Sequence, residues 1–203
     1  MSRTRLYFAG VPALAGVVLF GQGWWGVGLG LLGLAGFVLF FFRDPERVVA
    51  GRPGAIVSPA DGRVLAVEAA TLAGVPQTKV SIFLSLFDVH INRAPIAGRV
   101  VAVRYRPGKF HVASRAVAGR ENEQNEVTVE GEGTRVVFKQ IAGILARRIE
   151  FWKKPGDFLE RGERVGMIRF GSRVEVFFEP RCRVEVKPGE HVRGGSSILA
   201  VRE

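Results

Sequence analysis

The sequence predicts a mainly β body preceded by a hydrophobic helical hairpin. Three observations predict this fold class. No charged residue occurs from Leu6 to Phe42, and beyond Gly54 short runs rich in Val, Ile and Phe alternate with Gly, Pro and Asp. A Pro-Gly motif also recurs near the C-terminus. Because the chain has 203 residues and is 47% hydrophobic, we expect one compact core beyond the hairpin.

The first element is the charge-free run, which Gly21-Gln22-Gly23 divides into two apolar pieces. The second piece, Trp24 to Phe42, is near the length that spans a bilayer. Basic residues flank both ends of the run: Arg3 and Arg5 before it, and Arg43, Arg47 and Arg52 after it. By the positive-inside rule both ends then lie in the cytoplasm. We therefore expect a hairpin or re-entrant wedge at the cytoplasmic face of the cell membrane, whose glycines allow close helix packing.

Two alternatives for this run stay open. One is a cleavable signal peptide, and the other is a pair of buried helices in a soluble protein. We divide the chain into three parts: a membrane-associated segment at residues 1–43, a Pro/Gly-punctuated linker at 44–54, and a β body at 55–203.

The β body is predicted from eight short runs with strand-like composition. They are Ala55–Val57, Arg63–Glu68, Lys79–Leu84, Gly98–Tyr105, Glu126–Glu130, Thr134–Gln140, Arg164–Phe170 and Arg173–Phe178. The segment from Ile144 to Ile149 is compatible with one helical turn or with a strand.

An internal repeat supports the β reading. Residues 155–165 align with residues 188–198 at an offset of 33 (188 minus 155), and both follow a Pro-Gly-acid-x-aliphatic-x-x-Gly pattern. The pattern is similar to the paired half-motifs of biotinyl/lipoyl-type barrel-sandwich domains. No Met-Lys-Met or Asp-Lys-Ala lysine occurs at a turn, which weighs against a carrier role.

The charge and the cysteine count limit the partners. A net charge of +10 is compatible with nucleic acid or with an anionic membrane surface. The hydrophobic run favours anionic membrane lipid, and no nucleic-acid-binding fingerprint occurs. A single cysteine, Cys182, suits a reducing compartment. Three histidines without a Cys/His cluster predict no metal site.

The peptide between Gly171 and Ser172, in the stretch Met-Ile-Arg-Phe-Gly-Ser-Arg-Val at 167–174, is a candidate self-cleavage site. If the Ser172 hydroxyl reaches the Gly171 carbonyl, an N→O acyl shift makes an ester. β-Elimination then cuts the chain, and hydrolysis leaves a pyruvoyl group on residue 172. Gly171 suits this chemistry because it lacks a Cβ and tolerates strained geometry. Gly195-Ser196 is the other Gly-Ser peptide, and we expect it to be an ordinary turn.

Four further stretches accompany this peptide: Phe-Phe-Arg-Asp-Pro-Glu-Arg at 41–47, Ser-Pro-Ala-Asp-Gly at 58–62, Asp-Val-His-Ile-Asn-Arg-Ala-Pro at 88–95, and Glu-Asn-Glu-Gln-Asn at 121–125. In this order the five stretches resemble the phosphatidylserine decarboxylase family in its compact bacterial and archaeal form, over nearly the whole chain. The resemblance implies a β chain of residues 1–171 and an α chain of residues 172–203, associated as a heterodimer. It also implies conversion of phosphatidylserine to phosphatidylethanolamine and CO2. The pyruvoyl on Ser172 would form a Schiff base with the substrate amine and accept the electron pair left on Cα.

The resemblance also implies roles for other residues. Asp61 corresponds to the Asp of an Asp-His-Ser relay in longer family members, and His90 to the first of two histidines that stand three apart. Arg93 occupies the place of the second histidine, which is the one assigned to the relay. Two possibilities therefore stay open: His90 serves both processing and decarboxylation, or Asp61 acts directly or through water. By the same resemblance, the substrate-binding candidates are His111, Glu121 and Asn122.

Two other functions stay open at this point. One is decarboxylation of an archaeal-type serine phospholipid with ether-linked chains. The other is a membrane-tethered barrel-sandwich adaptor without catalysis, which predicts an uncleaved chain.

Overall fold

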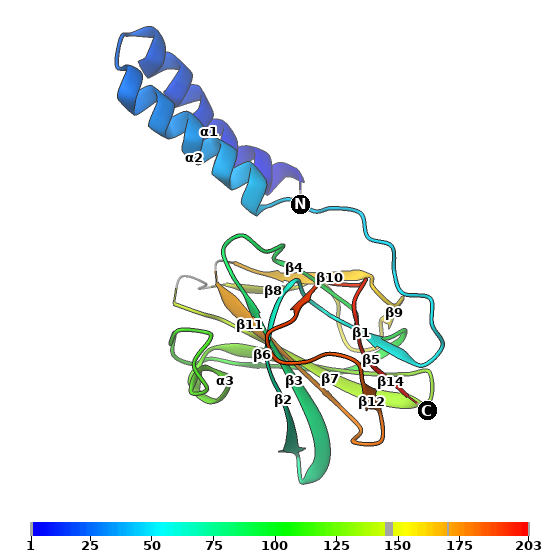
Figure 1. The fold of residues 1–203 in the computed structure, drawn as a ribbon. Coiled ribbons are helices and arrows are strands. Elements are labelled where there is room, and N and C mark those ends of the chain that lie inside the picture. The colour runs from blue at the N-terminus through cyan, green and yellow to red at the C-terminus, as the bar shows by residue number, and fades with distance from the viewer. Residues whose placement is uncertain (1, 145–147, 170, 203) are drawn as a thin grey trace. The chain divides into compact units, whose positions relative to one another are not determined.

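The computed structural model describes residues 2–144, 148–169 and 171–202. These form two compact units, Met1–Pro45 and Glu46–Glu203. The first unit is helical and the second is built almost entirely of strands (Figure 1). The predicted fold class, a mainly β body preceded by a helical hairpin, is therefore confirmed.

The first unit is a helical hairpin made of α1 (Ser2–Gly21) and α2 (Trp25–Phe41). The chain reverses at the predicted glycines, and Gly23 adopts the left-handed conformation at φ +85°. The two helices approach closely at Gly16 and Gly28, because a Cβ on Gly28 would lie 2.8 Å from the carbonyl oxygen of Gly16. Within the described residues, neither this pair nor the short helix α3 combines the length and apolarity of a membrane-spanning helix.

The second unit contains three antiparallel sheets (Figure 1). The largest has the order β13-β2-β3-β11-β7-β6-β5-β9, and the two smaller sheets have the orders β1-β14-β12 and β4-β10-β8. The strands are β1 (Ala55–Val57), β2 (Gly62–Leu72), β3 (Val75–Leu84), β4 (Ile91–Arg93), β5 (Gly98–Arg106), β6 (Gln124–Gly131), β7 (Thr134–Ile141), β8 (Ile149–Phe151), β9 (Phe158–Leu159), β10 (Arg164–Ile168), β11 (Ser172–Phe178), β12 (Arg183–Val184), β13 (His191–Val192) and β14 (Ile198–Val201). One short helix, α3 (Ala118–Glu121), precedes β6.

The central strand of the large sheet is β11, which pairs with β3 on one side and with β7 on the other. Every residue of β11 is buried. Because side chains alternate along a strand, Val174 and Val176 point into the hydrophobic core, while Arg173 and Glu175 form a buried ion pair of 2.8 Å on the opposite face. The strand that begins at Ser172 is therefore held by neighbours on both edges and both faces.

The two copies of the repeat have the same local structure. Each opens with a turn at a left-handed glycine, Gly156 (φ +98°) or Gly189 (φ +93°). A two-residue strand follows, β9 or β13, and then a second left-handed glycine, Gly162 (φ +76°) or Gly195 (φ +79°). The barrel-sandwich-like repeat inferred from the sequence is thus present as two equivalent half-motifs.

Within the ranges that it describes, the structure has six strands beyond the eight predicted runs: β4, β8, β9, β12, β13 and β14. Among the eight, the clearest differences in bounds are at β2, β3 and β10. β2 and β3 extend to a two-residue turn at Ala73 and Gly74, with Leu72 opposite Val75. This long hairpin projects from one end of the body (Figure 1). The tip of this hairpin makes few core contacts, so it does not need the large β-branched and aromatic residues that mark a strand. Its Ala- and Thr-containing sequence therefore did not predict the end of either strand. β10 ends at Ile168, and Phe170 lies outside the described residues. Ile149 begins β8, and residues 145–147 lie outside the described ranges.

Candidate active site

The peptide between Gly171 and Ser172 lies at the start of the central strand β11. Gly171 has a φ of +61°, which is the left-handed conformation that glycine adopts at low cost. The next residue, Ser172, is fully buried and pairs with Leu84 of β3. At this peptide bond the chain therefore passes directly from a residue in the left-handed conformation into a buried central strand.

The hydroxyl of Ser172 is buried and makes no hydrogen bond to any described residue. Leaving a buried hydroxyl unpaired costs about 1–3 kcal/mol, so structural serines are normally hydrogen-bonded. An unpaired Oγ beside the Gly171 carbonyl suits a nucleophile that is consumed in a reaction. The residues present therefore fit the conversion of Ser172 into a pyruvoyl group.

His90 contacts the same peptide segment from the end of the loop between β3 and β4. Its Nε2 accepts a hydrogen bond of 3.3 Å from the Gly171 N–H, and its Nδ1 lies 2.9 Å from the Asp88 carbonyl oxygen. A carbonyl oxygen only accepts, so Nδ1 carries the proton and Nε2 presents a lone pair. The Gly171 nitrogen is two covalent bonds from the carbonyl carbon that Ser172 would attack. A neutral imidazole whose Nε2 lone pair faces the Gly171 N–H thus lies next to the scissile peptide.

Asp88 holds His90 in this orientation. Its carboxylate accepts hydrogen bonds from the Ser85 N–H (2.8 Å) and the Ser85 hydroxyl (2.7 Å), and its Oδ1 lies 2.8 Å from His191 Nε2. These contacts fix the main chain whose carbonyl oxygen accepts the proton of His90 Nδ1. Asp88 is therefore a positioning residue that the sequence interpretation quoted in a motif without assigning it a role.

The carbonyl oxygen of Gly171 packs against Gly143. A Cβ on Gly143 would lie 1.9 Å from that oxygen, which no real Cβ contact tolerates, so this position requires glycine. Gly143 lies two residues after the end of β7 and faces Gly171 across the sheet end. Sequence reasoning missed it because a glycine after a strand does not indicate which backbone approaches it.

Asp61 lies in a different set of contacts. Its carboxylate accepts a hydrogen bond of 2.8 Å from the Gly194 N–H and forms an ion pair of 2.5 Å with Arg47. Burial raises the pKa of Asp61, although the Gly194 N–H and Arg47 both act to lower it. His90 is not among the hydrogen-bond partners of Asp61 in the described structure. The two residues linked in the sequence interpretation thus occupy neighbouring but separate networks.

Arg93, which stands in the place of the relay histidine of longer family members, is buried. Its Nη1 donates a hydrogen bond of 2.9 Å to the carbonyl oxygen of Gly162 in the repeat turn. This contact joins the segment after His90 to the first half-motif.

The three substrate-binding candidates lie together beside the site. Asn122 is fully buried, and its amide bonds the main chain of His111 in both directions and also donates to the Ala142 carbonyl oxygen at 2.7 Å. His111 and Lys109 both contact the exposed carboxylate of Glu121. The hydrogen bonds from Lys109 and His111 lower the pKa of Glu121. Asn122 thereby joins the loop that carries His111 to the segment that leads into Gly143.

A cavity of about 380 Å³ opens at Gly171. Its walls are almost entirely apolar, and they are formed by Phe83, Ser85, Leu86, Phe87, Val112, Ala113, Ile144 and Gly171. Its volume lies within the range of small-molecule sites. The sequence interpretation did not single out Leu86 and Phe87. Two large apolar residues next to the His90 motif could have indicated an apolar wall of the site.

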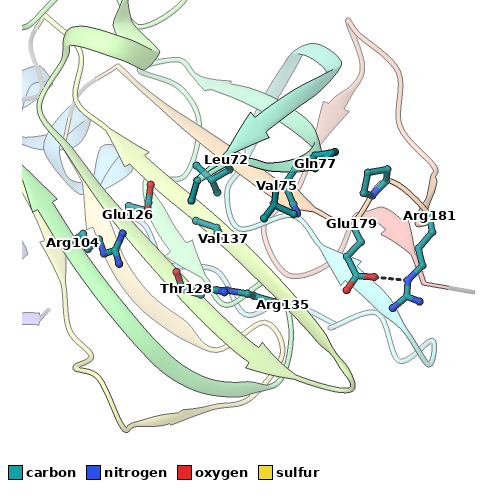
Figure 2. A pocket seen from close by; sticks show the side chains of 13 residues that line it. Leu72, Val75, Gln77, Arg104, Glu126, Thr128, Arg135, Val137, Glu179 and Arg181 are labelled. Carbon is teal, nitrogen blue, oxygen red and sulfur yellow. Dashed lines mark hydrogen bonds and ion pairs between the residues drawn. The ribbon is translucent and has the colours of Figure 1, made fainter.

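A larger cavity, of about 680 Å³, lies elsewhere, between the tip of the β2–β3 hairpin and strands β5, β6 and β7 (Figure 2). None of the predicted site residues lines it. Figure 2 shows Arg104, Arg135 and Arg181 around it, with Glu179 paired to Arg181. We place the chemistry in the smaller cavity, because that one contains Gly171.

Known proteins resemble this chain over most of its length. A family model described as phosphatidylserine decarboxylase matches residues 34–200. The chain is 54% identical over 172 residues to a phosphatidylserine decarboxylase proenzyme of Solibacter usitatus, which covers 85% of this chain and 82% of that protein. It is 46% identical to the proenzyme of the same description from Symbiobacterium thermophilum, over 95% of this chain and 91% of that protein. For the proenzyme from Ruegeria pomeroyi the identity is 44%, with the same two shares.

Proposed function

The chain belongs to the phosphatidylserine decarboxylase family, and we propose that it performs this family's reaction after cutting itself between Gly171 and Ser172. The reaction removes the carboxyl group of phosphatidylserine as CO2 and leaves phosphatidylethanolamine. The observation that carries the proposal is the buried, unpaired Ser172 hydroxyl, which follows a left-handed glycine whose N–H contacts His90 Nε2. The comparisons favour neither the ether-lipid alternative nor the adaptor alternative.

In the proposed self-cleavage, His90 Nε2 takes the proton of the Ser172 hydroxyl while Oγ bonds to the Gly171 carbonyl carbon. The carbon–nitrogen bond then breaks as the His90 imidazolium gives this proton to the nitrogen of residue 172, which becomes a free amine, and an ester replaces the peptide. Removal of the Ser172 Cα proton expels Gly171 as a carboxylate. Hydrolysis of the resulting dehydroalanine releases ammonia and leaves a pyruvoyl group at the start of the α chain.

When formed, the pyruvoyl group supplies an electron sink conjugated to the substrate amine. The chain's own residues supply the rest of the chemistry. His90 is within reach to return a proton to the substrate carbon that has lost CO2, and the apolar cavity walls exclude water from that carbon. Gly143 leaves room for the backbone of residue 171, and Asn122 holds two walls of the cavity together.

We keep Asp61 in the proposed catalytic set with a narrower role. It contacts Gly194, which belongs to the α chain after cleavage, and Arg47, which belongs to the β chain. Asp61 thereby ties the two chains together near Asp88 and His191, both of which influence its pKa. Whether it also moves a proton is decided by a comparison of Asp61→Asn with His90→Ala in self-cleavage.

The proposed partners are phosphatidylserine, anionic lipid and the chain's own two fragments. Three observations support membrane association at the cytoplasmic face: the net charge of +10, the arginines that flank residues 6–42, and a hairpin apolar on all sides. Deletion of residues 1–45 should preserve self-cleavage, because every contact of the site described above lies in the second unit. The same deletion should lower turnover on bilayers more than turnover on a dispersed short-chain lipid.

The experiment that tests the function is an intact-mass measurement on purified protein, paired with a decarboxylation assay. We expect two polypeptides, residues 1–171 and 172–203, with the smaller one beginning in a pyruvoyl group. A single intact chain that is an active decarboxylase would contradict the proposal. An intact and inactive chain would instead favour the adaptor alternative.

A further inference from the structure

We propose that the apolar rim of the cavity at Gly171, formed by Leu86, Phe87, Val112 and Ile144, enters the surface of the phospholipid bilayer. The substrate would then present its headgroup to residue 172 while its acyl chains stay in the membrane. This inference rests on the proposed function, since it takes residue 172 as the reacting position. It assigns a membrane contact to the β body itself, separate from any contact made by the helical hairpin.

The four side chains of the rim come from three segments that are far apart in the sequence. Phe87 is 70% exposed and Ile144 is 51% exposed, and Val112 is also exposed. All of them line the cavity at Gly171. Scattered exposed apolar residues are common, whereas a group gathered around one opening marks an interaction surface.

The size of the cavity indicates what the rim contacts. A volume of about 380 Å³ equals that of a cube about 7 Å on an edge. An acyl chain spans about half of the ~30 Å hydrocarbon core of a bilayer. The cavity therefore holds a headgroup and part of the glycerol but cannot enclose two acyl chains. A diacyl lipid can reach residue 172 only if its chains stay in the bilayer, and this requires the mouth of the cavity to lie at the bilayer surface.

The charges on the same segments suit an anionic surface. Lys109 and Arg115 flank Val112 in one segment, and Arg148 lies four residues after Ile144 in another; all three side chains are exposed. Lys109 pairs with Glu121 and Arg148 pairs with Glu150, both at the protein surface. Basic residues beside apolar side chains are attracted to anionic lipid headgroups while the apolar groups enter the interface. The one acidic residue between Leu84 and His90 is Asp88, whose carboxylate is held internally by Ser85 and His191.

The first test locates the rim directly in the full chain. An environment-sensitive dye is attached at Phe87→Cys and, in a control protein, at Val75→Cys. Val75 is a suitable control because it is 54% exposed and lines the larger cavity instead (Figure 2). The native Cys182 is buried and should stay unlabelled. On addition of phosphatidylserine-containing vesicles we expect a blue shift and stronger emission at position 87, and neither change at position 75.

The second test measures turnover. The double variant Phe87→Ser/Ile144→Ser is compared with Val75→Ser/Phe158→Ser, in which Phe158 is 63% exposed on β9. Removing two buried apolar contacts with lipid should lower turnover on phosphatidylserine vesicles by roughly tenfold or more. Turnover of a water-soluble short-chain phosphatidylserine should fall by a clearly smaller factor, because only the cavity wall is altered there and no membrane contact is needed. Phe87→Leu should restore most of the vesicle activity.

The outcomes separate the two proposals. If the dye at position 87 keeps its aqueous spectrum on vesicles that bind the chain, or if positions 75 and 87 respond equally, the rim proposal is wrong. An equal loss on both substrates would also overturn it, because it would show damage to the site. If self-cleavage and short-chain turnover are absent from the unmodified chain, the proposed function fails, whatever the dye reports.

Discussion

The chain contains two Gly-Ser peptides, at 171–172 and at 195–196, which share the glycine conformation and differ in the surroundings of the serine. Both glycines adopt the left-handed conformation, at φ +61° and φ +79°. Ser172 begins a central strand, is fully buried and has an unpaired hydroxyl among the described residues. Ser196 is partly exposed in a turn, where its N–H donates to the Arg193 carbonyl oxygen at 3.1 Å.

This comparison separates the conditions for self-cleavage from the dipeptide itself. A left-handed glycine is present at both sites, so backbone geometry alone does not distinguish them. What the second site lacks is burial of the hydroxyl and an adjacent imidazole lone pair. We therefore expect each of these features at residues 171–172 to be testable by its removal.

The largest effect is expected from the serines. Ser172→Ala should give one uncut chain without activity, because alanine offers no oxygen for the acyl shift. Ser196→Ala should be cut and active like the unmodified protein. Both variants are checked by intact mass. Cutting that persists in Ser172→Ala and stops in Ser196→Ala would reverse the comparison.

The next largest effect is expected from His90→Ala, which removes the imidazole from the site. Loss of a positioned base slows proton transfer by roughly 10²–10⁴-fold, so the precursor should accumulate for hours on a denaturing gel. Added imidazole should restore part of the rate, which a purely structural loss would not allow. Normal cleavage combined with failed decarboxylation would assign His90 to substrate chemistry alone.

A smaller effect is expected from Gly143→Ala. The new methyl group would lie 1.9 Å from the Gly171 carbonyl oxygen and must displace the carbonyl carbon that Ser172 attacks. Misplacement by about 1 Å costs up to ~10²-fold in rate, so we expect cleavage to slow between tenfold and a hundredfold. Gly51→Ala is the matched control, because nothing lies within 4 Å of its Cβ. Equal rates for the two variants would show that the packing of this carbonyl is irrelevant.

The smallest effect concerns Asp61 and pH. Burial raises the pKa of Asp61 in the folded protein. The stability that the protonated carboxyl contributes is therefore complete at pH values below the pKa of Asp61 in the unfolded chain. It is lost as the pH rises through the pKa of Asp61 in the folded protein. We compare two uncut proteins, the Ser172→Ala variant and the Ser172→Ala/Asp61→Asn double variant. The free energy of unfolding of the first minus that of the second should decline as pH rises. Urea unfolding at a series of pH values measures this difference. A difference that grows with pH would contradict the raised pKa.

Much of the fold followed from the sequence because local signals were strong. The charge-free run, the Gln22-Gly23 reversal and the 33-residue offset of the Pro-Gly motif all correspond to local structure. Only part of the candidate site could be predicted from the sequence. Gly171, Ser172 and His90 came from motifs, and the structure brings His90 into contact with Gly171. The approach of Gly143 to the Gly171 carbonyl and the contacts of Asp61 with Arg47 and Gly194 arise from long-range folding, which no local pattern records.

The position of β11 between β3 and β7 affects how the protein folds and whether it can refold after unfolding. Before the cut, folding is a first-order event in one chain, and β11 enters the middle of its sheet as a tethered segment. After the proposed cut, the same strand would belong to a separate fragment of residues 172–203, so recovery from unfolding would become second order and depend on concentration. Such a fragment would have to insert between two strands that have meanwhile lost their common neighbour. The mature enzyme would thus owe its persistence to slow unfolding, and each molecule would pass through its productive folding pathway once.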